Sequence, residues 1–330
     1  MNFKQFLRKT IRIVLPLALG CILLWYLYRD QNLSEMMTVI KTGVRYDILC
    51  GSLLFGLFAN AVRGFRWALL IDSLGKKVRW LNCVLAVYGN YAINMALPRV
   101  GEIWRCGIIS KYEKVPFAKL LGTLFIDRVM DTLVVGLLTL CTALFNIAFF
   151  KRYFADHPEF LDGINRLLTS VWIYVAIAVL VVVIWLIFTK LSHLPFVAKI
   201  KEVLLNVWEG IKSLWKMKHK PRFILQTLLI WAAYFLYFYV TFYAFDFTRD
   251  LGMRIALIAF TMSSIAVAIP IQGGIGVWHF AVISTLVIFG VHESDASAFA
   301  LIVYTIQSVL CLVIVGILSI FALSIINRKE

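Results

Sequence analysis

Several stretches of about 20 consecutive apolar residues constrain this 330-residue chain more than any other feature. A helix of that length spans the roughly 30 Å hydrocarbon core of a bilayer. The composition agrees, since 62% of the residues are hydrophobic and only 15% are charged. Within the bilayer every backbone N–H and C=O group needs an internal partner, so helices are the expected elements. The sequence therefore predicts an all-α polytopic membrane protein, with residues 1–330 forming a single integral membrane domain.

Six apolar segments are long enough to cross a membrane, and two more are interrupted near their centres. The predicted spans cover residues 12–28, 47–69, 118–150, 168–189, 223–245 and 297–325. The interrupted segments lie near 80–110 and 255–290 and contain Pro98 and Pro270, each followed closely by glycine. Proline lacks a backbone donor and breaks a helix, so each segment is expected to turn near mid-depth. The first span has a basic start, as in a signal peptide, but no small-residue cleavage site follows it.

The charges between the spans are distributed unevenly. Basic residues outnumber acidic ones in the N-terminal segment and in residues 62–79, 99–119 and 190–222. The charges are balanced or acidic in residues 29–47, 151–166, 246–254 and 291–296. Cytoplasmic loops of membrane proteins accumulate Lys and Arg, so the first group is predicted to be cytoplasmic and the second external. Both termini are then cytoplasmic, and the expected location is the inner (plasma) membrane.

Both flanks of each interrupted segment fall on the same side in this topology. Such a segment must enter the membrane, turn and leave on the side it entered, which makes it a re-entrant hairpin. The halves at about 47–150 and 223–325 then run in opposite senses, as in the inverted repeats of many secondary transporters. The sequence thus favours about six transmembrane helices plus two re-entrant helical hairpins, although each interrupted segment also fits two short spans.

Asp127, Arg128 and Asp131 lie inside the predicted span 118–150, about ten residues from its start. Charged groups at such a depth cost roughly 2.5–3.5 kcal/mol each on insertion scales. The two aspartates share a helix face at a spacing of four residues, and Arg128 can reach Asp131 at a spacing of three. Two interpretations stay open here. One is a buried ion pair that locks helix packing, and the other is a site that binds a polar headgroup or relays protons.

The two turns carry residue types that suit a phosphate. A half-helix that begins at such a turn directs free N–H groups and its positive dipole end inward. Glycine permits close approach to the backbone, and arginine adds positive charge. The candidate substrate-binding residues are Asn94, Arg99, Glu102, Arg105, Asp127, Arg128, Asp131, Gln272, Gly273, Gly274, Gly276 and His279. Tight helix packing is an alternative reason for the glycines, and a helix–helix hydrogen bond for Asn90 and Asn94.

Other features exclude several classes of function. The six cysteines form no CxxC pair and the five histidines lack ligand spacing, so no metal and no cofactor is expected. The net charge of +15 fits anionic lipid at the cytoplasmic leaflet better than nucleic acid. Residues 196–217 place apolar side chains at helical spacing among lysines, which predicts an amphipathic helix on that leaflet. A homo-oligomer is compatible with the sequence, which does not set the oligomeric state.

Three motifs follow one another along the chain. They are Leu-Pro-Arg-x-Gly-Glu at 97–102, Asp-Arg-x-x-Asp at 127–131 and Pro-x-x-Gly-Gly-x-Gly at 270–276. With these motifs the chain resembles the lysylphosphatidylglycerol synthase transmembrane family, over roughly residues 10–325. That family includes the flippase half of the multiple peptide resistance factor. The resemblance implies a lipid-translocating domain, here without the soluble aminoacyl-transfer domain of the large relatives. Members often carry a glutamate shortly after the glycines, where this chain has His279.

The sequence therefore favours a flippase-like lipid translocator, a transporter and not an enzyme, for a phosphate-bearing or aminoacylated membrane phospholipid. The headgroup would lie between the hairpin turns while the acyl chains stay in the bilayer. One alternative is an intramembrane lipid-modifying transferase that uses Asp127 or His279 as a base. No nucleophile–base spacing supports it. The other alternative is a membrane scaffold or an ion pathway.

Overall fold

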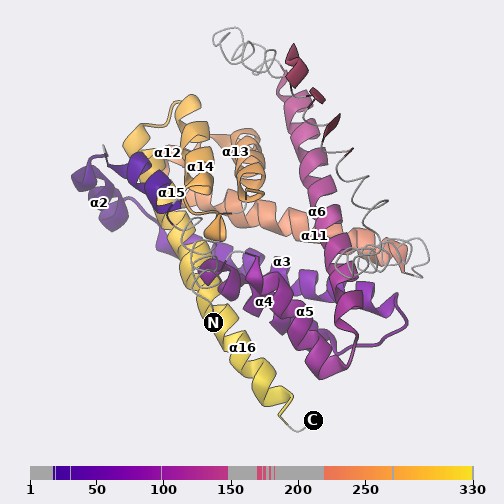
Figure 1. Ribbon diagram of the computed structural model, residues 1–330. Helices are drawn as coiled ribbons and strands as arrows, with labels where there is room; N and C mark the ends of the chain where they lie inside the picture. The colour runs from indigo at the N-terminus through magenta and orange to yellow at the C-terminus, as the bar shows by residue number, and fades with distance from the viewer. Residues whose placement is uncertain are drawn as a thin grey trace, which may run out of the picture.

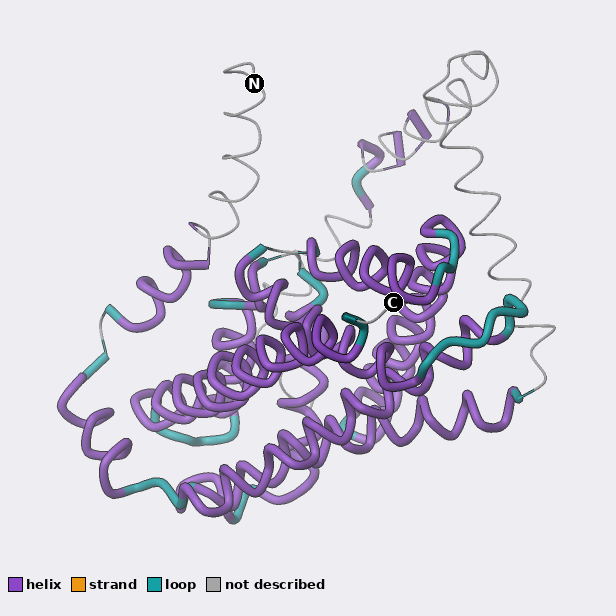
Figure 2. The backbone as a smooth tube through the Cα atoms, turned by 90° about the horizontal axis from the view of Figure 1, so that it is seen from below, coloured by secondary structure: helices purple, strands orange, loops and turns teal. Residues whose placement is uncertain are grey.

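The computed structural model consists of helices and loops over the residues that it describes. These are residues 20–29, 31–97, 99–147, 219–269 and 271–328, with residue 18 and a few residues between 169 and 182. No strand occurs among them, and Val44 and Phe245 form one isolated β-bridge. Figure 2 shows the helices joined by short loops. The predicted all-α class is confirmed, as expected for a chain whose backbone must satisfy its own hydrogen bonds in lipid.

Four long apolar helices match four of the predicted spans. They are α3 (Tyr46–Asp72), α6 (Phe117–Phe145), α11 continued by the 3-10 turn η1 (Lys220–Ala244), and the continuous stretch α15–η3–α16 (Glu293–Ile326). Each is long and apolar enough to cross a membrane. The predicted span 168–189 and the amphipathic helix 196–217 lie largely or wholly outside the described residues, as does the first part of the span 12–28.

The last of these stretches changes its winding midway. It consists of α15 (Glu293–Tyr304), the π-helical η3 (Thr305–Leu312) and α16 (Val313–Ile326). Gln307 within η3 donates through Nε2 to Ser52 Oγ at 3.0 Å and to the Tyr237 carbonyl at 2.9 Å. Tyr237 Oη in turn donates to the Gln307 carbonyl at 3.0 Å. The wide turn is thus tied to both α3 and α11.

The two interrupted segments each form a pair of shorter helices. The first pair is α4 (Trp80–Ala96) and α5 (Val100–Glu113). The second is α13 (Gly252–Val267) and α14 (Val277–Ile288), joined through the 3-10 turn η2 (Gln272–Gly274). These helices have 12 to 17 residues and rise about 18–26 Å, less than the roughly 30 Å core of a bilayer. Two short helices, α2 (Leu33–Thr42) and α12 (Asp246–Arg249), precede α3 and α13, and residues 20–28 are helical as well.

Two apolar clusters lie at opposite ends of the bundle. Leu49 belongs to one of them and Ile71 to the other, and they are 22 residues apart on α3, or roughly 33 Å. The Leu49 cluster draws on α11, α13, α14 and α15, and the Ile71 cluster on α4, α5, α6 and α16. Figure 1 shows the same division, with α12, α13 and α14 at the top and α4, α5 and the C-terminal end of α16 at the bottom.

The two ends differ in charge. Among the described residues the Ile71 end has nine basic residues against two acidic ones, namely Lys76, Lys77, Arg79, Lys111, Lys114, Lys119, Lys220, Arg222 and Arg328 against Asp72 and Glu113. The Leu49 end has five against six, namely Arg29, Lys41, Arg45, Arg249 and Arg254 against Glu35, Asp47, Asp246, Asp250, Glu293 and Asp295. The sequence-based count of basic residues in 62–79 and 99–119 included Arg63, Arg66 and Arg105 as loop charges. That part of the count was wrong, because α3 and α5 bury these three side chains inside the bundle. The asymmetry persists without them.

The turns of the two helix pairs contact each other. Arg99 Nη2 donates a hydrogen bond to the Ala268 carbonyl over 3.5 Å. A Cβ atom on Gly273 would lie 2.5 Å from Met95 Sδ and 2.7 Å from Tyr304 Oη, so the Met95 and Tyr304 side chains lie directly against this glycine. The turn between α4 and α5 therefore touches the turn between α13 and α14.

Glycine also permits close packing of α3 on α4. A Cβ atom on Gly64 would lie 2.5 Å from the Val84 Cα atom and 2.8 Å from its backbone nitrogen. Gly51 lies on the same helix and has no neighbour within 4 Å. Small residues are the usual means by which membrane helices come this close.

Gly64→Ala is expected to destabilise the protein by about 1–3 kcal/mol, because the backbone of α4 would have to move away. Gly51→Ala is the matched control and should leave stability unchanged or raise it by roughly 0.5–1 kcal/mol through helix propensity. Size-exclusion chromatography of detergent-solubilised protein after heating to graded temperatures measures both unfolding midpoints. Equal midpoints for the two variants would contradict the close approach of α3 and α4.

Candidate functional site

A cluster of buried charges lies where α3, α5 and α6 meet. Arg63 and Arg66 are three residues apart on α3, and Asp127 and Asp131 are four apart on α6, so each pair projects from one face of its helix. Arg105 reaches the same place from α5. The side chains of Arg66, Arg105 and Asp127 are completely buried. The charged cluster predicted for the span at Asp127 is therefore in the protein interior and does not face lipid.

The two arginines of α3 bridge the two aspartates of α6. Arg66 Nη2 lies 2.6 Å from Asp127 Oδ1 and 2.8 Å from Asp131 Oδ1. Arg63 Nη1 lies 2.5 Å from Asp131 Oδ2 and 3.7 Å from Asp127 Oδ2. Arg105 Nη2 makes a longer contact of 3.3 Å with Asp127 Oδ2. Charge-assisted hydrogen bonds of this kind are about twice as strong as neutral ones, so they tie α3 firmly to α6.

Aromatic rings and one hydroxyl complete the surroundings of the guanidinium groups. Arg105 lies over the Trp67 ring at 4.3 Å from its centre, and Arg63 over the Tyr234 ring at 5.6 Å. Arg66 Nη1 donates to Thr227 Oγ1 at 3.1 Å. Tyr234 and Thr227 belong to α11, so the second half of the chain contributes to the cluster. Arginine suits such a site because its planar group stacks on rings and is weakly hydrated.

Arg128 lies at the edge of the cluster. Its Nη1 atom is 3.7 Å from Asp131 Oδ2, which confirms the predicted proximity, but its shorter contact is with Glu102 of α5, at 3.0 Å between Nε and Oε1. Its side chain is 34% exposed. Sequence reasoning missed Arg63 and Arg66 as the main partners of Asp131. The signal was present, because both arginines lie inside the predicted span 47–69, where charge is as costly as at Asp127.

The cluster carries an excess of positive charge. Four arginines face three carboxylates, those of Glu102, Asp127 and Asp131. Among the described residues, Nε and Nη1 of Arg105 are buried without a hydrogen-bond partner. A buried donor without a partner is costly, and an oxyanion is the group that best supplies the missing acceptors. No group of three or more potential metal ligands occurs in the part of the chain that the structure describes.

Asn94 closes the turn between α4 and α5. Its Oδ1 atom accepts a hydrogen bond from the Gly101 N–H at 2.9 Å, and its Nδ2 atom is 3.4 Å from Asn90 Oδ1. Asn94 thus makes a hydrogen bond between α4 and α5, whereas the bond of Asn90 stays within α4, and a role of Asn94 in substrate binding stays a prediction. Arg99 sits at the turn with a left-handed backbone, φ +62°. Its guanidinium points to the other turn and does not join the buried cluster.

The glycines of the second turn serve conformation and packing. Gly273, Gly274 and Gly276 have φ values of +57°, +77° and +83°, in the left-handed region that favours glycine. A Cβ atom on Gly276 would lie 2.9 Å from the Leu23 side chain. The side chain of Gln272 is outside what the structure describes. A role of these residues in substrate binding stays a prediction.

His279 lies apart from the charged cluster. It is buried on α14 among aromatic rings, with centroid distances of 4.6 Å to Tyr304, 5.6 Å to Trp278 and 6.1 Å to Tyr28. The predicted residues thus fall into three groups. The charges of α5 and α6 come together with α3, the turns contact each other, and His279 belongs to the aromatic core near the Leu49 end.

Replacing Arg66 by Met is expected to destabilise the protein by about 3–5 kcal/mol, because both aspartates lose a buried partner. Arg128→Gln should cost less, since Asp131 keeps Arg63 and Arg66 and only Glu102 loses its partner. The sequence placed Arg128 within reach of Asp131, and the structure adds Arg63 and Arg66 as its closer partners. Thermal unfolding midpoints of the purified variants test the expected order. A larger loss for Arg128→Gln than for Arg66→Met would refute the observed pairing.

Known proteins give a consistent family assignment. The sequence profile described as the lysylphosphatidylglycerol synthase TM region matches residues 13–316. A UPF0104 membrane protein of Methanocaldococcus jannaschii is 25% identical over 136 residues, which make up 40% of this chain and 39% of that protein. No solved structure matches the chain. Because the profile covers nearly all of the sequence, the predicted resemblance is confirmed, and the chain belongs to the lysylphosphatidylglycerol synthase transmembrane region family.

Proposed function

We propose that this protein is a lipid translocator that moves a phosphate-bearing or aminoacylated phospholipid across the inner membrane. The observation that carries the proposal is the buried cluster of four arginines and three carboxylates between α3, α5 and α6. Intramembrane charge is costly and usually marks a substrate or ion pathway. The family assignment adds a lipid-related context, since its description names the membrane region of a lipid synthase.

Arg105 is the residue best placed to receive a phosphate. It has two buried donor atoms without a partner among the described residues, and its contact with Asp127 is longer than those of Arg66. A phosphate oxygen would compete with Asp127 for the Arg105 guanidinium. Arginine recognises phosphate through two parallel N–H bonds, which a single carboxylate contact at 3.3 Å does not satisfy.

Competition between a phosphate and Asp127 for Arg105 would couple headgroup binding to movement of α5. Glu102 and Arg105 are one turn apart on α5, and each binds α6, through Arg128 and Asp127. A phosphate that takes Arg105 from Asp127 would weaken the attachment of α5 to α6. A ligand shifts a conformational equilibrium only by binding one state more tightly, and here that state is the one with α5 released. The lipid would thus open the path that it uses.

The packing of the two halves supports an inverted repeat of about 47–150 and 223–325 with re-entrant hairpins. The first helix of each hairpin packs on the last span of the other half, α4 on α16 and α13 on α6. The first spans of the two halves, α3 and α11, pack on each other. The hairpin helices are short and enter from opposite ends. An exchange of contacts between such halves is how inverted-repeat transporters alternate access to a central site.

The lipid-modifying transferase lacks a comparable observation. Both oxygens of Asp127 already accept contacts from arginine, so this carboxylate is poorly placed to abstract a proton. His279, the other proposed base, lies in the aromatic core and not in the charged cluster.

Arg105→Gln is expected to reduce lipid translocation at least tenfold in proteoliposomes, with Lys111→Gln as a matched control. Lys111 lies on the same helix, is exposed, and loses the same charge when replaced. Dithionite quenching of fluorescent phosphatidylglycerol measures the fraction of lipid that has crossed. Equal rates for wild type and Arg105→Gln, at matched reconstitution and unfolding midpoint, would remove Arg105 from the pathway. A rate in wild-type vesicles no higher than in empty vesicles would refute translocation itself.

Cysteines introduced at Lys77 and Glu293 are expected to be labelled from opposite sides of the membrane. Lys77 lies at the basic end of the bundle and Glu293 at the balanced end, so the first should be cytoplasmic and the second external. An impermeant maleimide applied to intact cells, in a background without the six native cysteines, should label only position 293. Labelling of position 77 from outside would reverse the orientation.

A further inference from the structure

The two equivalent contacts between the halves are packed differently. Where α16 meets α4, a Cβ atom on Gly316 would lie 2.5 Å from Ala92 Cβ and 2.7 Å from the Tyr88 carbonyl. Where α6 meets α13, the helices touch at Thr142 and Thr261, and an open groove of about 340 Å³ lies beside that contact. One contact is therefore closely packed at a glycine, and the other leaves a groove. Packing of the repeat alone does not require this difference, so the open contact needs an explanation of its own.

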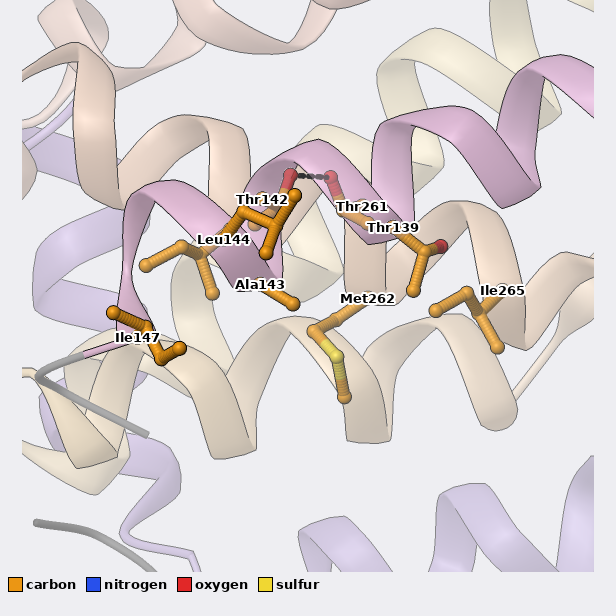
Figure 3. Close-up of a pocket in the computed structure, with 9 residues that line it drawn as sticks. Thr139, Thr142, Ala143, Leu144, Ile147, Thr261, Met262 and Ile265 are labelled. Carbon is orange, nitrogen blue, oxygen red and sulfur yellow. Dashed lines mark hydrogen bonds between the residues drawn. The ribbon is translucent and has the colours of Figure 1, made fainter. Parts of the chain in front are cut away.

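The cavity between α6 and α13 is an apolar groove. Its walls include Ala143 of α6 and Ile258, Met262 and Ile265 of α13, and Figure 3 shows side chains of the two helices around it. The hydroxyls of Thr142 and Thr261 are 3.0 Å apart and bind each other. Their polar groups are thus satisfied within the protein. A ligand in the groove meets hydrocarbon surfaces, and apolar cavities of this kind favour apolar ligands over water.

A positively charged side chain, that of Arg254, lies one helical turn beyond the end of the groove. Arg254 precedes the groove residue Ile258 by four positions on α13, about 6 Å along the helix. Its Nε atom donates to Asn146 Oδ1 at 2.6 Å, and Asn146 Nδ2 donates to the Thr142 carbonyl at 2.8 Å. The guanidinium is therefore held at the end of α6. Its two Nη atoms have no partner among the described residues, and Arg254 is exposed.

We infer that this groove binds one acyl chain of an anionic phospholipid whose phosphate pairs with Arg254. The occupant follows from the surroundings, because α6 exposes Leu133, Leu137 and Leu140 and a membrane places acyl chains against such a surface. An apolar groove with a guanidinium at its end matches a phospholipid in both shape and charge. The site is distinct from the buried cluster around Asp127. The inference requires only that the protein resides in a membrane, so it does not rest on translocation.

The test is native mass spectrometry of protein purified with phosphatidylglycerol and washed in detergent. Wild type is expected to retain one phosphatidylglycerol molecule. Ala143→Trp fills the groove and should lower the retained fraction at least fivefold. Leu140→Trp is the matched control, since Leu140 lies on the same helix, is exposed to lipid and does not line the groove. Arg254→Gln should reduce retention of phosphatidylglycerol but leave that of diacylglycerol, which has the same acyl chains and no phosphate, unchanged.

Several results would overturn the inference. They are equal retention by Ala143→Trp and wild type, equal loss in Ala143→Trp and Leu140→Trp, and a lipid-free dimer, which would assign the groove to a second copy. A benzophenone amino acid at Thr139 gives a second readout, which does not depend on the folding of the tryptophan variants. It should cross-link labelled phosphatidylglycerol in membranes more strongly than the same group at Leu137, and equal cross-linking would also count against the groove. Loss of translocation in wild type would refute the proposed function and leave lipid retention unaffected.

Discussion

The pairing of two arginines on α3 with two aspartates on α6 determines how the rest of the bundle can be arranged. Removing an ion from water costs several kcal/mol even after relaxation, and only close, well-directed contacts offset that cost. Here Arg66 contacts both Asp127 and Asp131, and Arg63 contacts the other oxygen of Asp131. A slip of α6 by one residue would rotate both carboxylates by about 100° and leave four charges unpaired in an apolar interior. The register of α3 against α6 is therefore strongly specified.

The position of α5 depends on this pairing. Arg105 and Glu102 attach α5 to α6 through Asp127 and Arg128. The pairing with α3 holds the segment of α6 that carries these two partners. The turn before α5 then lies against the second hairpin, where Arg99 reaches the Ala268 carbonyl and Gly273 accommodates Met95. Electrostatics at one depth and glycine packing at another thus bring together segments that are about 170 residues apart in the sequence.

Much of this arrangement was predictable from the sequence. Hydropathy predicted the spans of α3, α6, α11 and α16, because a membrane demands long apolar helices. The prolines at 98 and 270 predicted both helix breaks. The partners inside the bundle were not predictable, since the predicted span 47–69 places Arg63 and Arg66 at membrane depth but does not say which helix faces them. Pairing depends on which helices are neighbours, and a single sequence does not contain that information. For the same reason His279 was grouped with the phosphate-binding candidates, although its neighbours are Tyr304 and Trp278.

The π-helical turn at Thr305–Leu312 has a consequence for how the last span tolerates change in length. A π-helical turn closes its hydrogen bond one residue later than an α-helical turn, so it accommodates an extra residue within the helix. Residues before the π-helical turn pack in the aromatic core. Residues after it pack along α4, where Gly316 lies against Ala92. The extra residue thus acts as a phase adjustment between two halves of one helix that face different neighbours. Deleting one residue within η3 would let the helix wind regularly and keep Gly316 close to α4, whereas a deletion in the regular helix α15 would turn Gly316 away by about 100°. The stretch that looks most irregular is then the one where the last span best tolerates the loss of a residue.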